Sequence, residues 1–169
     1  RLVTLHGPGG VGKTRLVQEL GRRQAADFSG GVWFCDLSKV HDLPAACQII
    51  AAVLEVPLHK RDPVAIIGDA LRGRGEMLLI LDNLEQLVDA LRPVLARWQG
   101  ACPALRILVT SRVALSLPGE QHFPLSPLSL TGAQPHSSAA ATLFLIRARS
   151  HRPGFKADPT IDALVALLD

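Results

Sequence analysis

Eight residues near the start of the chain have the types and spacing needed to wrap a chain of phosphates. They fit the pattern G-x-x-x-x-G-K-S/T and run Gly7, Pro8, Gly9, Gly10, Val11, Gly12, Lys13, Thr14. Glycines let backbone N–H groups approach phosphate oxygens closely, in conformations that other residues avoid. The pattern predicts that Lys13 reaches the β- and γ-phosphates and that the Thr14 hydroxyl binds Mg²⁺. It therefore favours a nucleotide site over its alternative, a flexible glycine turn.

A carboxylate that could hold the same metal ion follows an apolar run later in the chain. Residues 78–81 are Leu-Leu-Ile-Leu, which is typical of a strand buried on both faces, and Asp82 comes next. We expect Asp82 to bind Mg²⁺, directly or through water, rather than to act only as a turn or helix cap. Asn83 cannot accept a proton from water, which leaves Glu85 as a candidate base. Glu85 is equally explained as a first-turn helix residue, so rapid hydrolysis is not predicted.

An arginine stands at the end of a further strand-like run. Residues 105–109 are Leu-Arg-Ile-Leu-Val, a mostly apolar run of strand length, and Thr110, Ser111 and Arg112 follow them. A guanidinium at this place could distinguish ATP from ADP, because it makes fixed paired bonds to the oxygens of a γ-phosphate. The alternative is an exposed arginine after a strand. Beside the other two motifs, we favour the phosphate-sensing role for Arg112.

The elements that must position these residues alternate between strands and helices. The expected strands cover residues 2–6, 32–37, 77–81, 105–109 and 120–125. The expected helices begin near Lys13, after the caps Asp42 and Asp62, and over 84–98, 139–149 and 161–168. This order predicts an α/β fold with a parallel sheet, in which ligands bind beyond the carboxyl ends of the strands. All three motifs fall at such ends.

Two segments of the pattern are irregular. Pro93 lies within the span 84–98, so that helix either kinks there or starts late with Asp89 as its cap. Residues 124–135 are rich in Pro, Ser and Gly, which predicts a linker. The stretch 128–134 has only a superficial likeness to the signature helix of ABC transporters and follows Asp82, where that helix would precede it.

Composition limits the remaining classes of function. With 169 residues, 48% hydrophobic and 20% charged, the chain suits one globular domain with a core, and it has no apolar run long enough to span a membrane. A net charge of +3 from scattered arginines argues against direct binding of nucleic acid. The three cysteines lack metal-ligand spacing; Cys35 and Cys47 are expected in the core, and a reducing cytoplasm fits. The chain opens at Arg1 inside an apolar run, as expected for an excised fragment.

Taken in order, the motifs resemble the nucleotide-binding domain of bacterial STAND ATPases, especially those of SARP- and LuxR-type transcriptional regulators. That group is related to the NB-ARC domains of plant resistance and apoptotic proteins. The matching segments are residues 7–16, 31–34, 79–85, 101–112 and 118–121. Residues 144–155 resemble the start of the family's helical lid.

The resemblance implies a three-layer α/β/α P-loop NTPase with a five-stranded parallel sheet in the order 5-1-4-3-2. It implies a nucleotide-binding core over residues 1–130, followed by a linker and a truncated lid over 131–169. It also implies a switch: ADP keeps the protein closed, and ATP exchange opens it for self-assembly, with slow Mg-dependent hydrolysis at most. The partners implied are a winged helix, sensor repeats and a DNA-binding domain elsewhere in a longer, cytoplasmic protein.

The resemblance also implies roles for individual residues of this chain. Lys13 and Thr14 would contact phosphates and Mg²⁺, Asp82 would hold Mg²⁺, and Arg112 would be the sensor. The nucleotide contacts implied run from Gly7 to Thr14 and include Arg15. The family usually continues beyond residue 169 into Gly-Leu-Pro-Leu and carries another contact before Arg1, so this fragment is expected to bind weakly or to be empty.

Three rivals share some of these features. An active AAA-type motor ATPase has the same phosphate loop and acidic strand end, but it turns over rapidly. A scaffold domain would have lost nucleotide use, against which the intact Lys13, Thr14 and Asp82 argue. A GTPase would carry an Asn-Lys-x-Asp motif, which the sequence lacks.

Overall fold

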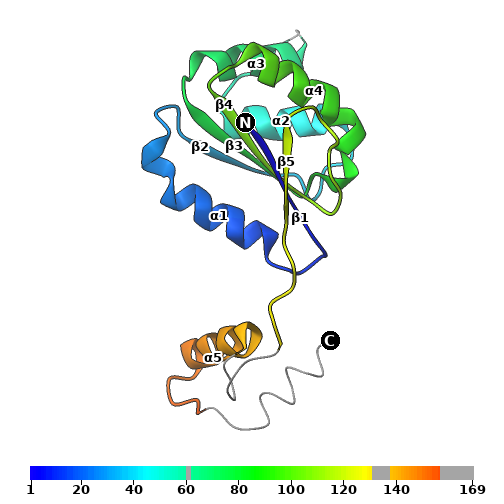
Figure 1. Cartoon of the computed structure of the whole chain (residues 1–169). Coiled ribbons are helices and arrows are strands. Elements are labelled where there is room, and N and C mark those ends of the chain that lie inside the picture. Colours follow the sequence, from blue (N-terminus) through cyan, green and yellow to red (C-terminus); the bar gives the residue numbers. More distant parts are fainter. Residues whose placement is uncertain (60–61, 131–137, 157–169) are drawn as a thin grey trace. The chain divides into compact units, whose positions relative to one another are not determined.

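A computed structural model describes residues 1–59, 62–130 and 138–156. Within residues 1–125 a five-stranded parallel sheet forms the centre of the fold (Figure 1). The strands are β1 (Leu2–His6), β2 (Val32–Asp36), β3 (Met77–Asp82), β4 (Leu105–Ser111) and β5 (Glu120–Pro124). They lie in the order β2-β3-β4-β1-β5, and every neighbouring pair is parallel. The predicted α/β fold and strand order are confirmed.

Successive side chains of β3 enter two separate cores. Leu78 and Ile80 pack in a cluster that contains Val17 of α1 (Lys13–Arg23). Leu79 and Leu81 enter the larger cluster, to which α2 (Leu43–Val53), α3 (Pro63–Gly73) and α4 (Val88–Ala101) contribute. Figure 1 shows α1 on one side of the sheet and the other three helices on the opposite side. Because helices cover both faces, all of β3 is buried, which explains its unbroken apolar sequence.

The starts of α2 and α3 follow from local chemistry. The Asp42 carboxylate accepts a hydrogen bond from the Ala45 amide at 2.8 Å, and the Asp62 carboxylate accepts one from the Val64 amide at 3.0 Å. Each helix also has a proline in its first two positions, where no backbone N–H bond is lost. Both predicted caps are confirmed. Cys35 and Cys47 are buried in the larger core, as expected.

The helix around Pro93 starts late. A 3₁₀ turn, η2 (Leu84–Gln86), comes first, and α4 begins at Val88 with Pro93 inside it. The prediction of Asp89 as the cap is wrong: Leu87 occupies the cap position. Asp89 lies in the first turn, with its Oδ1 3.4 Å from Nη1 of Arg92. Asn83 has a left-handed backbone (φ 61°), which turns the chain before η2 and delays the helix. Pro93 then lies in the second turn of α4, where its missing N–H costs one backbone hydrogen bond of the helix.

The chain divides into two compact units, Arg1–Leu125 and Ser126–Asp169. In the second unit α5 (Ala139–His151) begins at Ser138, whose hydroxyl accepts a hydrogen bond from the Ala141 amide at 3.1 Å. Ala141 and Leu145 are buried against neighbours within this unit. The linker residues 131–137 and the helix expected over 161–168 lie outside the described residues. That this unit is a lid stays a prediction. Over the described ranges we find no helix with the length and hydropathy required to cross a bilayer.

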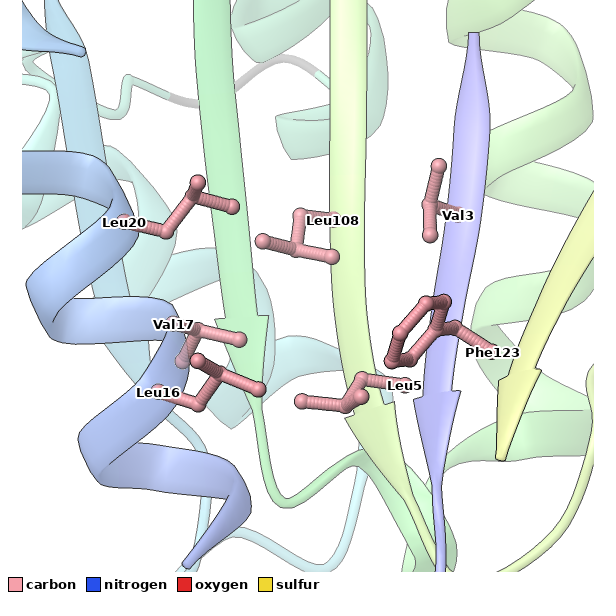
Figure 2. Close-up of a pocket in the computed structure, with 7 residues that line it drawn as sticks. All are labelled: Val3, Leu5, Leu16, Val17, Leu20, Leu108 and Phe123. Atoms are coloured by element: carbon pink, nitrogen blue, oxygen red, sulfur yellow. The ribbon is translucent and has the colours of Figure 1, made fainter. Parts of the chain in front are cut away.

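An apolar groove runs between α1 and the sheet (Figure 2). Its seven lining side chains come from α1, β1, β4 and β5 and are Val3, Leu5, Leu16, Val17, Leu20, Leu108 and Phe123. Leu16, Val17 and Leu20 share a face of α1, as predicted, but only Val17 is buried. Leu16 is 43% exposed, Leu20 is 36% exposed, and Phe123 on the edge strand β5 is 56% exposed.

Glu120 at the start of β5 ties down the loop before it. Its carboxylate accepts hydrogen bonds from the amides of Leu115 and Leu117, both at 3.0 Å, and its side chain is only 1% exposed. Burial alone would raise the pKa of this carboxyl, but the donors around it prevail and the pKa is lowered. His122 lies 3.6 Å away and, when protonated, adds to the same effect.

We expect Glu120→Gln to reduce the free energy of unfolding by about 2 kcal/mol at pH 7, the usual value for hydrogen bonds to a charged group. Because the folded-state pKa is lowered, the stabilisation is complete above the unfolded value near 4.5 and is lost as pH falls through the folded value. Urea unfolding at a series of pH values from 7 downward follows this loss. A deficit that stays the same size as the carboxyl becomes protonated would show that the charge contributes nothing.

Candidate nucleotide site

The loop between β1 and α1 has a backbone that only glycine adopts easily. Gly10 has φ 77° and Gly12, which caps α1, has φ 97°. A third glycine, Gly7, is required by close approach: a Cβ there would lie 2.3 Å from the backbone oxygen of Leu125. The loop therefore leaves β1 tightly beside β5 and delivers the amino end of α1 to the carboxyl edge of the sheet. Amides at such an end, with the helix dipole, attract anions.

Lys13 is a buried cation without a carboxylate. Its side chain is 8% exposed, and its ammonium donates to the carbonyl oxygens of Gly7 and Pro8, each at 2.8 Å. In the described part of the chain these carbonyls are its only polar partners. Buried charges are normally paired, so an ammonium held by two neutral oxygens indicates a place prepared for an anion.

Asp82 is the opposite case, a buried carboxylate without a cation. It is 1% exposed and accepts hydrogen bonds from Thr14 (Oγ1 to Oδ2, 2.8 Å), Thr110 (Oγ1 to Oδ1, 2.5 Å) and Asn83 (Nδ2 to Oδ2, 2.9 Å). Over the described ranges no Lys, Arg or His pairs with it. The structure thus brings Thr14 and Asp82 into direct contact, as a shared metal site requires.

The sequence interpretation did not include Thr110 in the site. Its buried hydroxyl donates a hydrogen bond to Asp82 and accepts one from the backbone N–H of Asn83 at 2.9 Å. Thr110 therefore also fixes the left-handed turn after β3. The signal was available in the strand order. With β3 beside β4 and Leu81 opposite Val109, the next residues on the two strands, Asp82 and Thr110, must meet.

Arg112 and Glu85 meet at the mouth of the site. The Arg112 Nε atom lies 3.2 Å from Oε1 of Glu85, which belongs to the turn η2. Both line one pocket with the phosphate loop, whose other lining residues are Gly9, Gly10, Gly12, Lys13, Thr14, Arg15 and Asn83. Gly7, Pro8 and Val11 shape the loop without lining that pocket. Glu85 fits both of its predicted descriptions, since it stands in the first turn of η2 and also faces the pocket.

The oxygen donors of this site could hold Mg²⁺ only if a bound phosphate and water supplied the rest of its coordination shell. Over the residues described, no group of three His, Cys, Asp or Glu side chains comes together. Thr14 and Asp82 offer a hydroxyl and a carboxylate, the hard oxygen donors that Mg²⁺ prefers. A magnesium ion there would complete its shell with water and phosphate oxygens, as is usual for nucleotide sites. The buried, cation-free carboxylate of Asp82 fits such an ion.

Comparison with known proteins agrees with this geometry. Residues 1–131 match the NACHT domain family. This chain belongs to that family. NACHT domains are P-loop NTPases of the STAND class, which confirms the resemblance found in the motifs.

Two mycobacterial relatives and one solved structure place the NACHT domain in longer proteins. An uncharacterised protein of Mycobacterium tuberculosis is 38% identical over 160 residues, which are 92% of this chain and 38% of that protein. A second, named as a candidate HTH-type transcriptional regulator, is 36% identical over 158 residues, 92% of this chain and 17% of its own length. A STAND protein with a tetratricopeptide repeat sensor from Pyrococcus horikoshii shares the fold, with a TM-score of 0.56 and 17% identity over 99% of this chain and 25% of that one.

Proposed function

We propose that this NACHT domain is a nucleotide-operated switch that binds ATP or ADP with Mg²⁺ and hydrolyses ATP slowly at most. The buried ammonium of Lys13 carries the proposal. Two carbonyls hold it at the amino end of α1, and the Thr14–Asp82 pair lies beside it. A polyphosphate with a divalent cation supplies what both groups lack, an anion for Lys13 and a cation for Asp82.

Each residue of the pocket then has a chemical role. The amides of the loop from Gly9 to Thr14 and the Lys13 ammonium bind the phosphates, and Arg15 and Arg112 line the outer part of the pocket. Thr14 and Asp82 hold Mg²⁺, which neutralises charge on the phosphate oxygens. Arg112 contacts a γ-phosphate and so responds differently to ATP and ADP.

Slow hydrolysis follows from the residues after Asp82. Asn83 donates its amide to the Asp82 carboxylate, and an amide cannot take a proton from water. Glu85 is a carboxylate that lines the pocket, and its Oε1 is engaged by Arg112. A nucleotide that is not consumed quickly suits a switch better than an AAA-type motor. Steady turnover of about tens of ATP per second, an ordinary enzymatic rate, would contradict the switch.

The relatives suggest where such a switch operates. One of them is named as a candidate HTH-type regulator, and this domain matches only 17% of it. We infer that the chain serves a longer cytoplasmic signalling protein or transcriptional regulator, in which other domains bind DNA, sense the signal and support ATP-dependent self-assembly. Scattered arginines and a net charge of +3 fit a domain that does not itself bind nucleic acid. Three buried thiols fit a reducing compartment.

The metal site gives a direct test. In the wild type, we expect Mg²⁺ to strengthen binding of a non-hydrolysable ATP analogue by about tenfold or more, and Asp82→Asn to remove most of that gain. The melting temperature without nucleotide should stay the same or rise, because the substitution removes a buried charge that no cation pairs with in the described residues and leaves its neighbours' shape intact. Calorimetry with Mg²⁺ or EDTA, together with thermal unfolding, measures both effects.

The outcomes separate the alternatives. A Mg²⁺ dependence that survives in Asp82→Asn would show that another group holds the metal. Failure of the folded wild type to bind either ADP or the ATP analogue, even at nucleotide concentrations high enough to reveal weak binding, would favour a scaffold domain that no longer uses nucleotide.

A further inference from the structure

The ion pair between Glu85 and Arg112 joins a fixed partner to a free one. The Glu85 side chain is 22% exposed and the Arg112 side chain is 67% exposed. Glu85 lies in a turn that the buried Leu84 anchors in the core, whereas Arg112 follows the end of β4. A long exposed side chain has many rotamers to lose, so the less exposed carboxylate is the group that orients the pair.

The contact leaves the phosphate-binding end of the guanidinium available. The ion-pair contact with Glu85 is made at Nε, at 3.2 Å. Nη2 is on the side of the phosphate loop, since a Cβ built on Gly9 would lie 3.9 Å from it. Apart from this ion pair, Arg112 makes no hydrogen bond or ion pair with the described residues. A guanidinium held through Nε presents its two amino groups as a fork for phosphate oxygens.

The same contact argues against Glu85 as the base. Its Oε1 is engaged by Arg112, and its Oε2 is buried, with no hydrogen-bond donor reaching it from the described residues. A general base must place a free oxygen within hydrogen-bond reach of the attacking water. Neither oxygen of Glu85 is both free and accessible in this arrangement.

We propose that Glu85 is a positioning residue: its carboxylate holds Arg112 by Nε so that both amino groups face the phosphate loop and discriminate ATP from ADP. The proposal rests on the proposed nucleotide site and adds how that site tells one nucleotide from the other. It assigns Glu85 to specificity and takes it out of proton transfer. The contact requires an oxygen at position 85 that can accept from Nε of Arg112, whether that oxygen is charged or neutral.

The test is the ratio of the affinities for a non-hydrolysable ATP analogue and for ADP, measured by calorimetry on the whole chain. Glu85→Ala should lower the relative affinity for the ATP analogue by about two- to fivefold, the range expected for a partly exposed ion pair. Glu85→Gln keeps an oxygen for Nε and should restore most of the ratio. Because each variant is compared with itself, a general loss of folded protein cancels.

Arg112→Ala supplies the control. It should lower the same ratio at least as far as Glu85→Ala, and in that background Glu85→Ala should change the ratio no further, because the two residues act as one unit.

Four results would overturn the inference. If Arg112→Ala changes the ratio and Glu85→Ala does not, the sensor stands and the positioning role fails. If Glu85→Ala raises the ratio, the carboxylate competes with the γ-phosphate instead of preparing Arg112 for it. If Glu85→Gln loses turnover at an unchanged ratio, Glu85 is the base. If the wild type binds neither nucleotide, the proposed function itself fails and the inference falls with it.

Discussion

Replacing Lys13 by alanine should weaken the binding of both Mg-ATP and Mg-ADP by about 30-fold or more. Removing one member of a buried charge pair costs about 2–5 kcal/mol, because the other member is left uncompensated. Here the other member is the polyphosphate, and the ammonium is already desolvated before it arrives, at 8% exposure and with only Gly7 and Pro8 carbonyls as partners among the described residues. The free-energy cost of desolvating the Lys13 ammonium is therefore met when the protein folds. Its attraction to the polyphosphate is then not reduced by that cost on binding.

Calorimetry on the two proteins measures the loss, and a matched variant controls for charge. Arg22→Ala removes a positive charge from the same helix, but Arg22 is 73% exposed and pairs with Glu19 outside the pocket. We expect it to bind nucleotide within about twofold of the wild type, since exposed charges are largely screened. Wild-type affinity in Lys13→Ala would remove Lys13 from the site and, with it, the observation on which the proposed function depends.

The parts of the fold that sequence predicted well are those decided by near neighbours. β3 is buried on both faces, so its apolar run could be recognised without knowing its partners. The helix caps at Asp42 and Asp62 depend on amides only two or three residues away. The phosphate loop is equally local, because the conformation of its glycines and the hydrogen bond of Lys13 to Gly7 depend only on the backbone of one turn.

The parts that sequence did not predict depend on distant neighbours. Thr110 joins Asp82 only because β4 lies beside β3 in one particular register. The Glu85–Arg112 pair likewise needs both strand ends in place. Leu16 and Leu20 follow a helical apolar pattern, yet the described residues leave them 43% and 36% exposed, so the pattern alone does not predict how far they are buried. The turn at Asn83 moved the start of α4, which no local cap signal revealed.

Gly30, at the entry to β2, gives the prediction with the largest expected effect on stability. A Cβ there would lie 2.2 Å from the carbonyl oxygen of Arg74 and 3.0 Å from that of Glu76. These are backbone atoms, which cannot turn aside as a side chain can, and the Gly30 amide also donates to the Glu76 oxygen at 2.7 Å. Gly30→Ala must push apart the segments that lead into β2 and β3, so we expect it to lower the free energy of unfolding by about 3 kcal/mol.

Gly73→Ala is the matched control, because its new methyl group would meet no atom within 4 Å at the end of α3. There the loss of backbone freedom in the unfolded chain should stabilise the protein by about 0.4–1 kcal/mol. Urea unfolding of the two variants therefore separates steric conflict from a change in backbone entropy, since the substitution is chemically identical. Equal effects at the two positions would mean that the contact between Gly30 and Arg74 is not as close in solution. Gly30 does not line the nucleotide pocket, so the folded fraction of Gly30→Ala should still bind ADP, which distinguishes this loss of stability from the loss of binding in Lys13→Ala.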